Sequence, residues 1–298
     1  SVFQVAYMLV MATKAKELLR DTDLLAVLTA ALCHDADHPG VSNDFLIHAE
    51  SPLSLLYNDV SVLENHHCRT AFEILLMDDQ GIFKGLTHDE RTEVRRAIVS
   101  SILATDMRYH ASYVSRMRVV AEAHQQDPES EVPLDIDKEQ DRQLLMDMLV
   151  HCADLSGQTM KHSLARQWGQ RVLEEFRQQT VLEKKRGLPT LPFMMDLHDP
   201  LKQATTQKNF ISFVVEPLWK VFCSVFHEVE HLHKSLCENL DAYKMEEARL
   251  LEAREKAESE PQSQDESKSV TLSKEDVKKM LSKPDEDDPP RIPRTLSS

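Results

Sequence analysis

Glycine is scarce in this chain, with six among 298 residues. Sheet-rich proteins use glycine at their many tight turns because it adopts positive φ angles without strain, so its scarcity argues against such a fold. No run of about 18 apolar residues occurs, which predicts that no segment spans a membrane. The apolar residues 1–11 lack a basic leader and a cleavage site, so we expect no signal peptide. They also lack an initiator methionine and have the pattern of a helix interior, so we expect a fragment of a longer protein.

Cysteine is infrequent, odd in number and scattered through apolar segments. The five cysteines are Cys33, Cys68, Cys152, Cys223 and Cys237. They predict reduced, buried thiols in a cytoplasmic protein and argue against a disulfide framework. Positive charge is also sparse, because 35 Lys and Arg against 50 Asp and Glu give a net charge of −15. This charge argues against nucleic acid or an anionic membrane as a partner, but a bound metal could still attract an anionic small substrate.

Apolar residues recur at helical spacing along most of the chain, which predicts an all-α, compact multi-helix domain. The first clear helix begins near residue 21 and would continue to Pro39, which places His34 and His38 on one face. Ser61 and Glu64 have the spacing of a capping box that opens another helix.

Later segments follow the same helical pattern. Helices are predicted over 87–104, 140–153, 161–185 and from Lys208 to about 258 with a bend at Pro217. The proline-containing stretch 186–208 predicts a long ordered loop of the kind that lines binding sites. We expect a folded domain over 1–245, followed over 246–298 by a charged helical extension and a disordered acidic tail.

The densest chemistry in the chain lies in His34-Asp35-Ala36-Asp37-His38, which places two imidazoles and two carboxylates within five residues. His151-Cys152-Ala153-Asp154 offers another carboxylate about a hundred residues later. Buried ionisable groups must be paired or must coordinate a metal. These residue types therefore leave two interpretations, a buried salt-bridge network and a divalent-metal site, and we test hydrolysis at a metal centre first.

Other histidines are less informative. His66 and His67 are compatible with either a structural or a functional role. His227, His231 and His233 have helical spacing beside acidic residues, and this pattern favours an ordinary helix face over a second metal site.

Five segments occur together in an order that resembles the catalytic domain of class I cyclic nucleotide phosphodiesterases over about residues 1–240. They are His34–Gly40 with Asn43, Tyr57–His67, Ala104–Met107, His151–Ser156, and Gln207–Ile211 with Glu216–Trp219. Any one of these segments alone would be weak evidence. Their common order and spacing are specific to this family.

The resemblance implies a pair of divalent ions. His34, Asp35 and Asp154 would ligate zinc, and Asp35 would bridge it to Mg²⁺ or Mn²⁺ that is otherwise held by water. Imidazole suits zinc, whereas carboxylate and water suit magnesium. Such a pair activates water and stabilises in-line attack on phosphorus.

The resemblance also implies roles around those ions. His38 would contact the substrate phosphate or the attacking water, and Glu64 would orient a catalytic histidine. Gln207 would hydrogen-bond the purine edge and Phe210 would stack on the base. The substrate-binding residues implied are Asn43, Met107, Leu155, Gln207, Phe210 and Ile211.

The chain departs from the family pattern in two places. A segment Tyr-His-Asn-x-x-His, which supplies a general acid and a zinc ligand in the family, would precede Ser1 and is absent. We therefore expect the 298 residues alone to be inactive or nearly so, and the full-length protein to be the enzyme. Gly157-Gln158 stands where many members carry an Asn-Pro or similar pair, which leaves the choice between cAMP and cGMP open.

The resulting hypothesis is metal-dependent hydrolysis of cAMP and/or cGMP to the 5′-monophosphate, which would end cyclic nucleotide signalling. Two alternatives stay open: another HD-type nucleotide phosphohydrolase, and a catalytically dead relative that binds nucleotide or acts as a scaffold. A homodimer and regulatory domains upstream of Ser1 are left open as partners.

Overall fold

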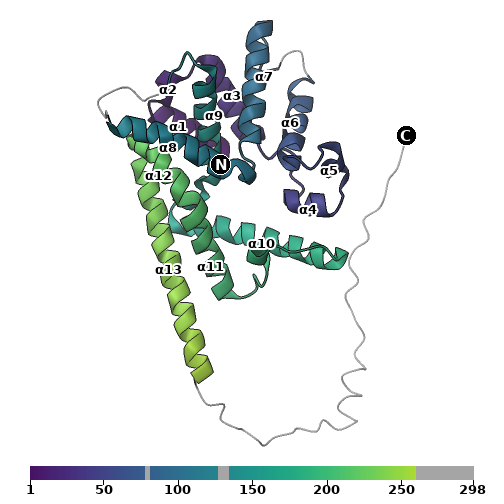
Figure 1. The fold of residues 1–298 in the computed structure, drawn as a ribbon, viewed down its shortest axis with the longest axis vertical. Helices are drawn as coiled ribbons and strands as arrows, with labels where there is room; N and C mark the ends of the chain where they lie inside the picture. Colours follow the sequence, from purple (N-terminus) through teal and green to yellow (C-terminus); the bar gives the residue numbers. More distant parts are fainter. Residues whose placement is uncertain (78–80, 127–133, 260–298) are drawn as a thin grey trace, which may run out of the picture. The chain divides into compact units, whose positions relative to one another are not determined.

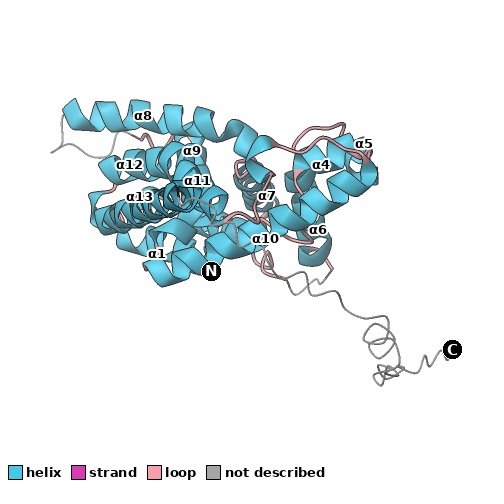
Figure 2. Cartoon of the chain, turned by 90° about the horizontal axis from the view of Figure 1, so that it is seen from below, coloured by secondary structure: helices cyan, strands magenta, loops and turns pink. Residues whose placement is uncertain are grey.

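The structure is a computed structural model, and it describes residues 1–77, 81–126 and 134–259. These residues contain helices and loops and no strand (Figure 2), so the all-α prediction is confirmed. The α-helices are α1 (Val2–Ala12), α2 (Ala15–Leu18), α3 (Asp21–Cys33), α4 (Asn43–His48), α5 (Pro52–Leu56), α6 (Val62–Leu75), α7 (His88–Leu103), α8 (His110–Gln126), α9 (Glu139–Asp154), α10 (His162–Arg186), α11 (Pro200–Phe210), α12 (Glu216–Val225) and α13 (Glu230–Ser259). Within the described ranges, none of these helices combines the length and hydropathy needed to traverse a bilayer.

Helix α9 lies at the centre of the larger hydrophobic core. Its Leu145, Met148 and Leu149 are almost completely buried, and each such side chain contributes about 1.5–3 kcal/mol to folding. The helix packs against α1, α3, α7 and α8, several of which surround it in Figure 1. Because Asp154 is the last residue of α9, this packing determines where its carboxylate lies.

A smaller core joins the segment after α3 to helices α4 and α6. It consists of Val41, Phe45, Leu46, Val62 and Leu63. Leu188, just beyond α10, packs on its edge. Glu64 follows Leu63 in the first turn of α6, so this core positions the Glu64 carboxylate.

Helix α3 ends earlier than predicted, at Cys33, and His34 is its C-terminal cap. Asp37 has a φ of +60°, in the left-handed region, which an α-helix of L-residues does not pass through. Pro39 further disfavours helical geometry at His38. The prediction that His34 and His38 share a helix face is therefore wrong, because a turn separates them.

Helix α6 begins where expected, but the predicted capping box is wrong. Ser61 has a φ of +43° and makes no cap hydrogen bond with its side chain. Its hydroxyl instead donates to Asp106 at 2.7 Å. The Glu64 carboxylate accepts hydrogen bonds from Asn43. Tertiary partners have replaced the local pairing that the spacing suggested.

The helix predicted from Lys208 begins earlier, at Pro200, where the Asp199 side chain accepts from the Leu201 amide. The predicted loop over 186–208 is correspondingly shorter. A π-helical segment (Ile211–Val215) separates α11 from α12. Pro217 cannot donate to the carbonyl four residues earlier, and the widened turn before it accommodates that loss.

The remaining predicted helices are confirmed as α7, α9 and α10. Residues Ser1–Arg254 form one compact unit. Helix α13 is continuous across residue 245, where we predicted a boundary, and reaches Ser259. The predicted acidic tail over 260–298 lies outside the described residues.

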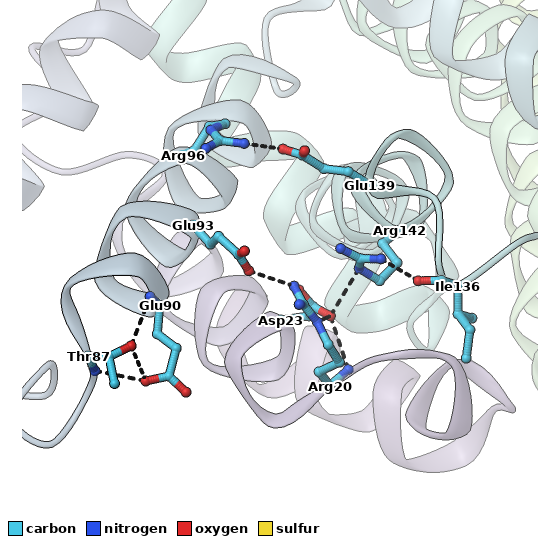
Figure 3. Close-up of polar contacts among 9 residues, drawn as sticks. All are labelled: Arg20, Asp23, Thr87, Glu90, Glu93, Arg96, Ile136, Glu139 and Arg142. Atoms are coloured by element: carbon cyan, nitrogen blue, oxygen red, sulfur yellow. Dashed lines mark hydrogen bonds and ion pairs between the residues drawn. The ribbon is translucent and has the colours of Figure 1, made fainter.

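A cluster of charged side chains ties α3, α7 and α9 together (Figure 3). The buried Asp23 carboxylate accepts from Nε and Nη2 of Arg20, each at 3.0 Å. Arg142 Nε lies 3.6 Å from the same carboxylate, and Glu93 accepts from Arg20 at 3.1 Å. This ionic cluster fastens the helices that carry the candidate site.

Candidate metal and nucleotide site

The first donor group consists of His34, Asp35 and Asp154, where the end of α3 meets the end of α9. His34 Nδ1 lies 3.0 Å from the Ala31 carbonyl, and since a carbonyl only accepts, Nδ1 carries a proton. Its Nε2 atom lies 3.2 Å from Asp35 Oδ2 and 3.3 Å from Asp154 Oδ1. The predicted proximity of these three side chains is confirmed.

This first donor group fits a divalent cation. His34 Nε2 is buried and makes no hydrogen bond of acceptable geometry, although two carboxylates lie beside it. Two ligands at about 2.0–2.1 Å from a tetrahedral zinc would be about 3.3 Å apart, close to the observed separations. Burial disfavours the imidazolium, but the adjacent carboxylates of Asp154 and Asp35 outweigh it and raise the pKa of His34 to about 10. A cation at Nε2 would replace that proton.

A second donor group consists of Asp35, His38 and His67, whose ligand atoms lie within 4.8 Å of one another. His67 Nδ1 donates to the Ala36 carbonyl at 2.7 Å, which leaves Nε2 facing Asp35 Oδ1 at 3.8 Å. Burial lowers the pKa of His67, so its imidazole is neutral near pH 7 and can act as a ligand. Asp35 belongs to both donor groups, as a bridging carboxylate would.

His67 is a residue of the cluster that the sequence left undecided. It adjoins His66, whose Nε2 lies 2.8 Å from Asp37 Oδ2. Both histidines therefore fasten the turn after α3 onto α6, one through a side chain and one through a backbone carbonyl. Only the curvature of that turn distinguishes the histidine that faces Asp35 from its neighbour.

Glu64 is buried and is held by one amide. Asn43 Nδ2 donates to its two carboxylate oxygens at 3.0 and 3.3 Å, and Asn43 Oδ1 accepts from the Leu63 amide at 2.8 Å. Burial raises the pKa of Glu64, the Asn43 hydrogen bond opposes this, and the nearby charges of Asp106 and Asp35 add to the rise. In this structure Asn43 supports Glu64, and its contact with substrate stays a prediction.

The predicted base-binding residues lie around the end of α11. Gln207 is buried; its Oε1 accepts from Gln158 Nε2 at 3.3 Å, and its Nε2 donates to the Gly169 carbonyl at 3.2 Å. Phe210 is partly exposed, whereas Ile211 is completely buried in the main core. Ile211 packs in that core, and its contact with substrate stays a prediction.

The remaining predicted substrate residues differ in exposure. Met107 is exposed and follows Asp106, whose carboxylate accepts from the Arg108 amide at 2.8 Å. Leu155 is half-buried and packs against the main core. It opens the 3₁₀ segment Leu155–Thr159, directly after Asp154.

Gln158 is a residue that the sequence did not assign to the site. It lies four positions beyond Asp154, in the segment Leu155–Thr159. This short segment joins the first donor group to Gln207. The departure from the family pattern at positions 157 and 158 could have drawn attention to Gln158. Nothing in the sequence indicated that Gln158 contacts Gln207.

Known proteins with a similar sequence are enzymes of one type. The chain is 36% identical over 243 residues to human "High affinity cGMP-specific 3′,5′-cyclic phosphodiesterase 9A", covering 81% of this chain and 39% of that protein. It is 37% identical over 243 residues to mouse "3′,5′-cyclic-AMP phosphodiesterase 4C", covering 81% of this chain and 35% of that protein. The chain thus spans little more than a third of these curated relatives.

Solved structures give the same result. The phosphodiesterase domain of the Salpingoeca rosetta rhodopsin phosphodiesterase superimposes with a TM-score of 0.80 at 34% identity, over 86% of this chain and 75% of that one. A second structure of the phosphodiesterase domain from this choanoflagellate gives a TM-score of 0.78 at 35% identity, over 84% and 77% of the two chains. Residues 1–236 also match the family described as 3′5′-cyclic nucleotide phosphodiesterase. The chain therefore belongs to the 3′,5′-cyclic nucleotide phosphodiesterase family.

Proposed function

We propose that the protein hydrolyses 3′,5′-cyclic nucleotides, cAMP and/or cGMP, to 5′-nucleoside monophosphates and so ends cyclic nucleotide signals. The observation that carries this proposal is the convergence of Asp35 and Asp154 on the buried Nε2 atom of His34. His34 is buried, Asp154 is partly buried and Asp35 is exposed. A cation between them would satisfy the buried imidazole nitrogen and offset the repulsion between the two carboxylates. Family membership supports the same reaction.

His34, Asp35 and Asp154 would hold zinc, and Asp35 would share Mg²⁺ or Mn²⁺ with water beside His38 and His67. Divalent ions at such a site supply Lewis acidity and a water of lowered pKa. His38 would contact the phosphate. Its imidazole is exposed and stacks on His67 with ring centroids 5.5 Å apart, so it can reach a ligand from a supported position.

Gln207 would recognise the purine edge, with Phe210 against the base. After its bonds to Gln158 and Gly169, each end of the Gln207 amide keeps one hydrogen-bonding position. One donor and one acceptor match either purine, which is why we propose no preference between cAMP and cGMP. We further propose a cytoplasmic location; a homodimer and upstream regulatory domains stay open.

Metal binding is the first test. Titration of the chain with Mn²⁺, followed by electron paramagnetic resonance, should detect two bound ions. Asp154→Asn should weaken the tighter site by more than about tenfold, whereas Asp241→Asn, on the exposed surface of α13, should not. Equal Mn²⁺ binding by all three proteins would contradict the proposed metal centre.

Nucleotide binding is the second test, and it separates the alternatives. With Mn²⁺ present, Gln207→Ala should weaken cAMP or cGMP binding by about tenfold because one hydrogen-bonded amide is lost. Gln178→Ala, on the exposed face of α10, is the matched control. Another HD-type hydrolase would be indifferent to Gln207→Ala. Hydrolysis itself is measured with cAMP and with cGMP as substrates.

A further inference from the structure

Helix α10 contacts the segment that follows the metal-binding turn through one buried glutamine. Gln179 is 2% exposed. Its partner Ser42 lies 137 residues earlier in the chain. Gln179 Oε1 accepts from the Ser42 amide at 2.8 Å, and its Nε2 donates to Ser42 Oγ at 3.0 Å. One side chain therefore holds Ser42 at two points.

Ser42 connects this contact to Glu64. It is the N-terminal cap of α4 and its hydroxyl accepts from the Phe45 amide at 3.2 Å. The next residue is Asn43, whose amide donates to both oxygens of Glu64. The path from α10 to the Glu64 carboxylate thus consists of the Gln179–Ser42 hydrogen bonds, the covalent link from Ser42 to Asn43 and the Asn43–Glu64 hydrogen bonds.

Glu183 completes the arrangement one turn further along α10. Its Oε1 atom accepts from Gln179 Nε2 at 2.7 Å. Its Oε2 atom is buried and has no hydrogen-bond partner among the described residues. A buried carboxyl group with only one oxygen hydrogen-bonded is costly. We infer that Glu183 offsets this cost by orienting the Gln179 amide. With both Nε2 hydrogens directed at Glu183 and Ser42, the amide cannot flip.

We propose that Gln179, oriented by Glu183, is a positioning residue that fixes Ser42 and Asn43 and thereby the Glu64 carboxylate. This inference rests on the proposed function only for the role of Glu64 in the reaction. Gln179 is not among the groups that face the metal donors, so it acts through Asn43.

The test measures Glu64 directly. Gln179→Met keeps the length of the side chain and removes both bonds to Ser42, and Gln178→Met makes the same change on the exposed face of α10. Carbon-13 NMR of the Glu64 carboxyl follows its titration in each protein without added metal. In Gln179→Met we expect the titration midpoint to rise by about one pH unit, because Glu64 loses aligned donors to its charged form. Gln178→Met should keep the midpoint of the unmodified chain.

A folded Gln179→Met protein in which Glu64 titrates as in the unmodified chain would overturn the proposal. Because Glu183 loses its donor in this variant, Gln179→Met combined with Glu183→Gln provides a second protein with a neutral partner. If neither variant folds, Gln179 holds the fold as a whole and the proposal fails. The readout needs neither metal nor substrate, so its failure is distinguishable from a failure of Gln207→Ala to affect nucleotide binding.

Discussion

Gly169 and Gln207 lie so close that no side chain fits between them. Gln207 Nε2 donates to the Gly169 carbonyl at 3.2 Å, and a Cβ atom placed on Gly169 would be 2.9 Å from Gln207 Oε1. Such a separation is shorter than a carbon–oxygen contact allows. The absence of a side chain in the middle of α10 therefore makes room for the amide that we propose reads the base.

Gly169→Ala should displace Gln207 and weaken cyclic nucleotide binding by about tenfold, as loss of a hydrogen-bonded group would. Metal binding should be unchanged, because the hydrogen bonds of Gln207 go to Gln158 and Gly169 and not to a metal donor. Gly157→Ala is the control, since its Cβ would be 3.8 Å from Trp168, an ordinary contact. Calorimetric titration with cAMP and cGMP checks this, and equal affinities in the two variants would exclude the steric role of Gly169.

Asn43→Ala should destabilise the protein by about 1.5–3 kcal/mol, the range for a hydrogen bond to a charged group. The reason is that the buried Glu64 carboxylate would keep its charge without its two amide contacts. Urea unfolding at pH 7 measures the difference. Asn209→Ala, on the exposed surface of α11, should change the free energy of unfolding by less than about 0.5 kcal/mol; comparable losses in both variants would contradict the prediction.

Asp147 predicts a pH dependence of stability. Burial raises its pKa from 3.8 to about 6, despite hydrogen bonds from Gln143, Ser101 and Tyr113. The folded state then binds the extra proton between these two values, so the stability contributed by Asp147 is complete below about pH 4 and is lost as the pH rises through 6. Asp147→Asn removes this loss.

Relative to the unmodified chain, the free energy of unfolding of Asp147→Asn should rise by about 2 kcal/mol between pH 4 and pH 7. Taking the difference between the two proteins matters because His151, whose pKa burial lowers to about 4, titrates in the opposite sense over the same range. Asp241→Asn on the surface should track the unmodified chain. A difference that stays constant with pH would show that Asp147 does not titrate in this range.

The ionic cluster of Figure 3 predicts unequal costs for two acidic residues. Asp23→Ala leaves Arg142, whose side chain is only 12% exposed, without its carboxylate and should cost about 3–5 kcal/mol. Glu139→Ala breaks the exposed ion pair with Arg96 and should cost less than about 1 kcal/mol. Thermal and urea unfolding of both variants check the order, which the reverse ranking would contradict.

The local pattern predicted most helices well, but it placed the end of α3 too late and misassigned the side-chain partners at the start of α6. Helices α7, α9 and α10 follow from apolar spacing, because the apolar stripe that each helix buries is formed by residues of that helix alone. The end of α3 precedes a turn that contains the left-handed Asp37, and at the start of α6 the side chains of Ser61 and Glu64 bond to Asp106 and Asn43 and not to each other's backbone. Residues from elsewhere in the chain decide such boundaries, so a local window cannot show them.

The donor side chains were identified for a similar reason, since charged groups clustered in an apolar setting require a partner wherever they lie. Which of His66 and His67 faces Asp35 was not predictable, because the two are neighbours on one helix and only the path of residues 34–40 separates their roles. Gln158, Gly169 and Gln179 were missed because each acts through a contact that spans between 38 and 137 residues.

By itself, the sequence determined the helical class of this protein, the family to which it belongs and the three side chains that converge at the ends of α3 and α9. Those properties depend on periodicity and on the chemical character of individual residues. The tertiary structure alone decided that Asn43 supports Glu64, that Ile211 is buried and that α10 reaches both Gln207 and Ser42. Side-chain hydrogen bonds act only within about 3.5 Å, and folding alone brings residues so distant in the chain within that reach.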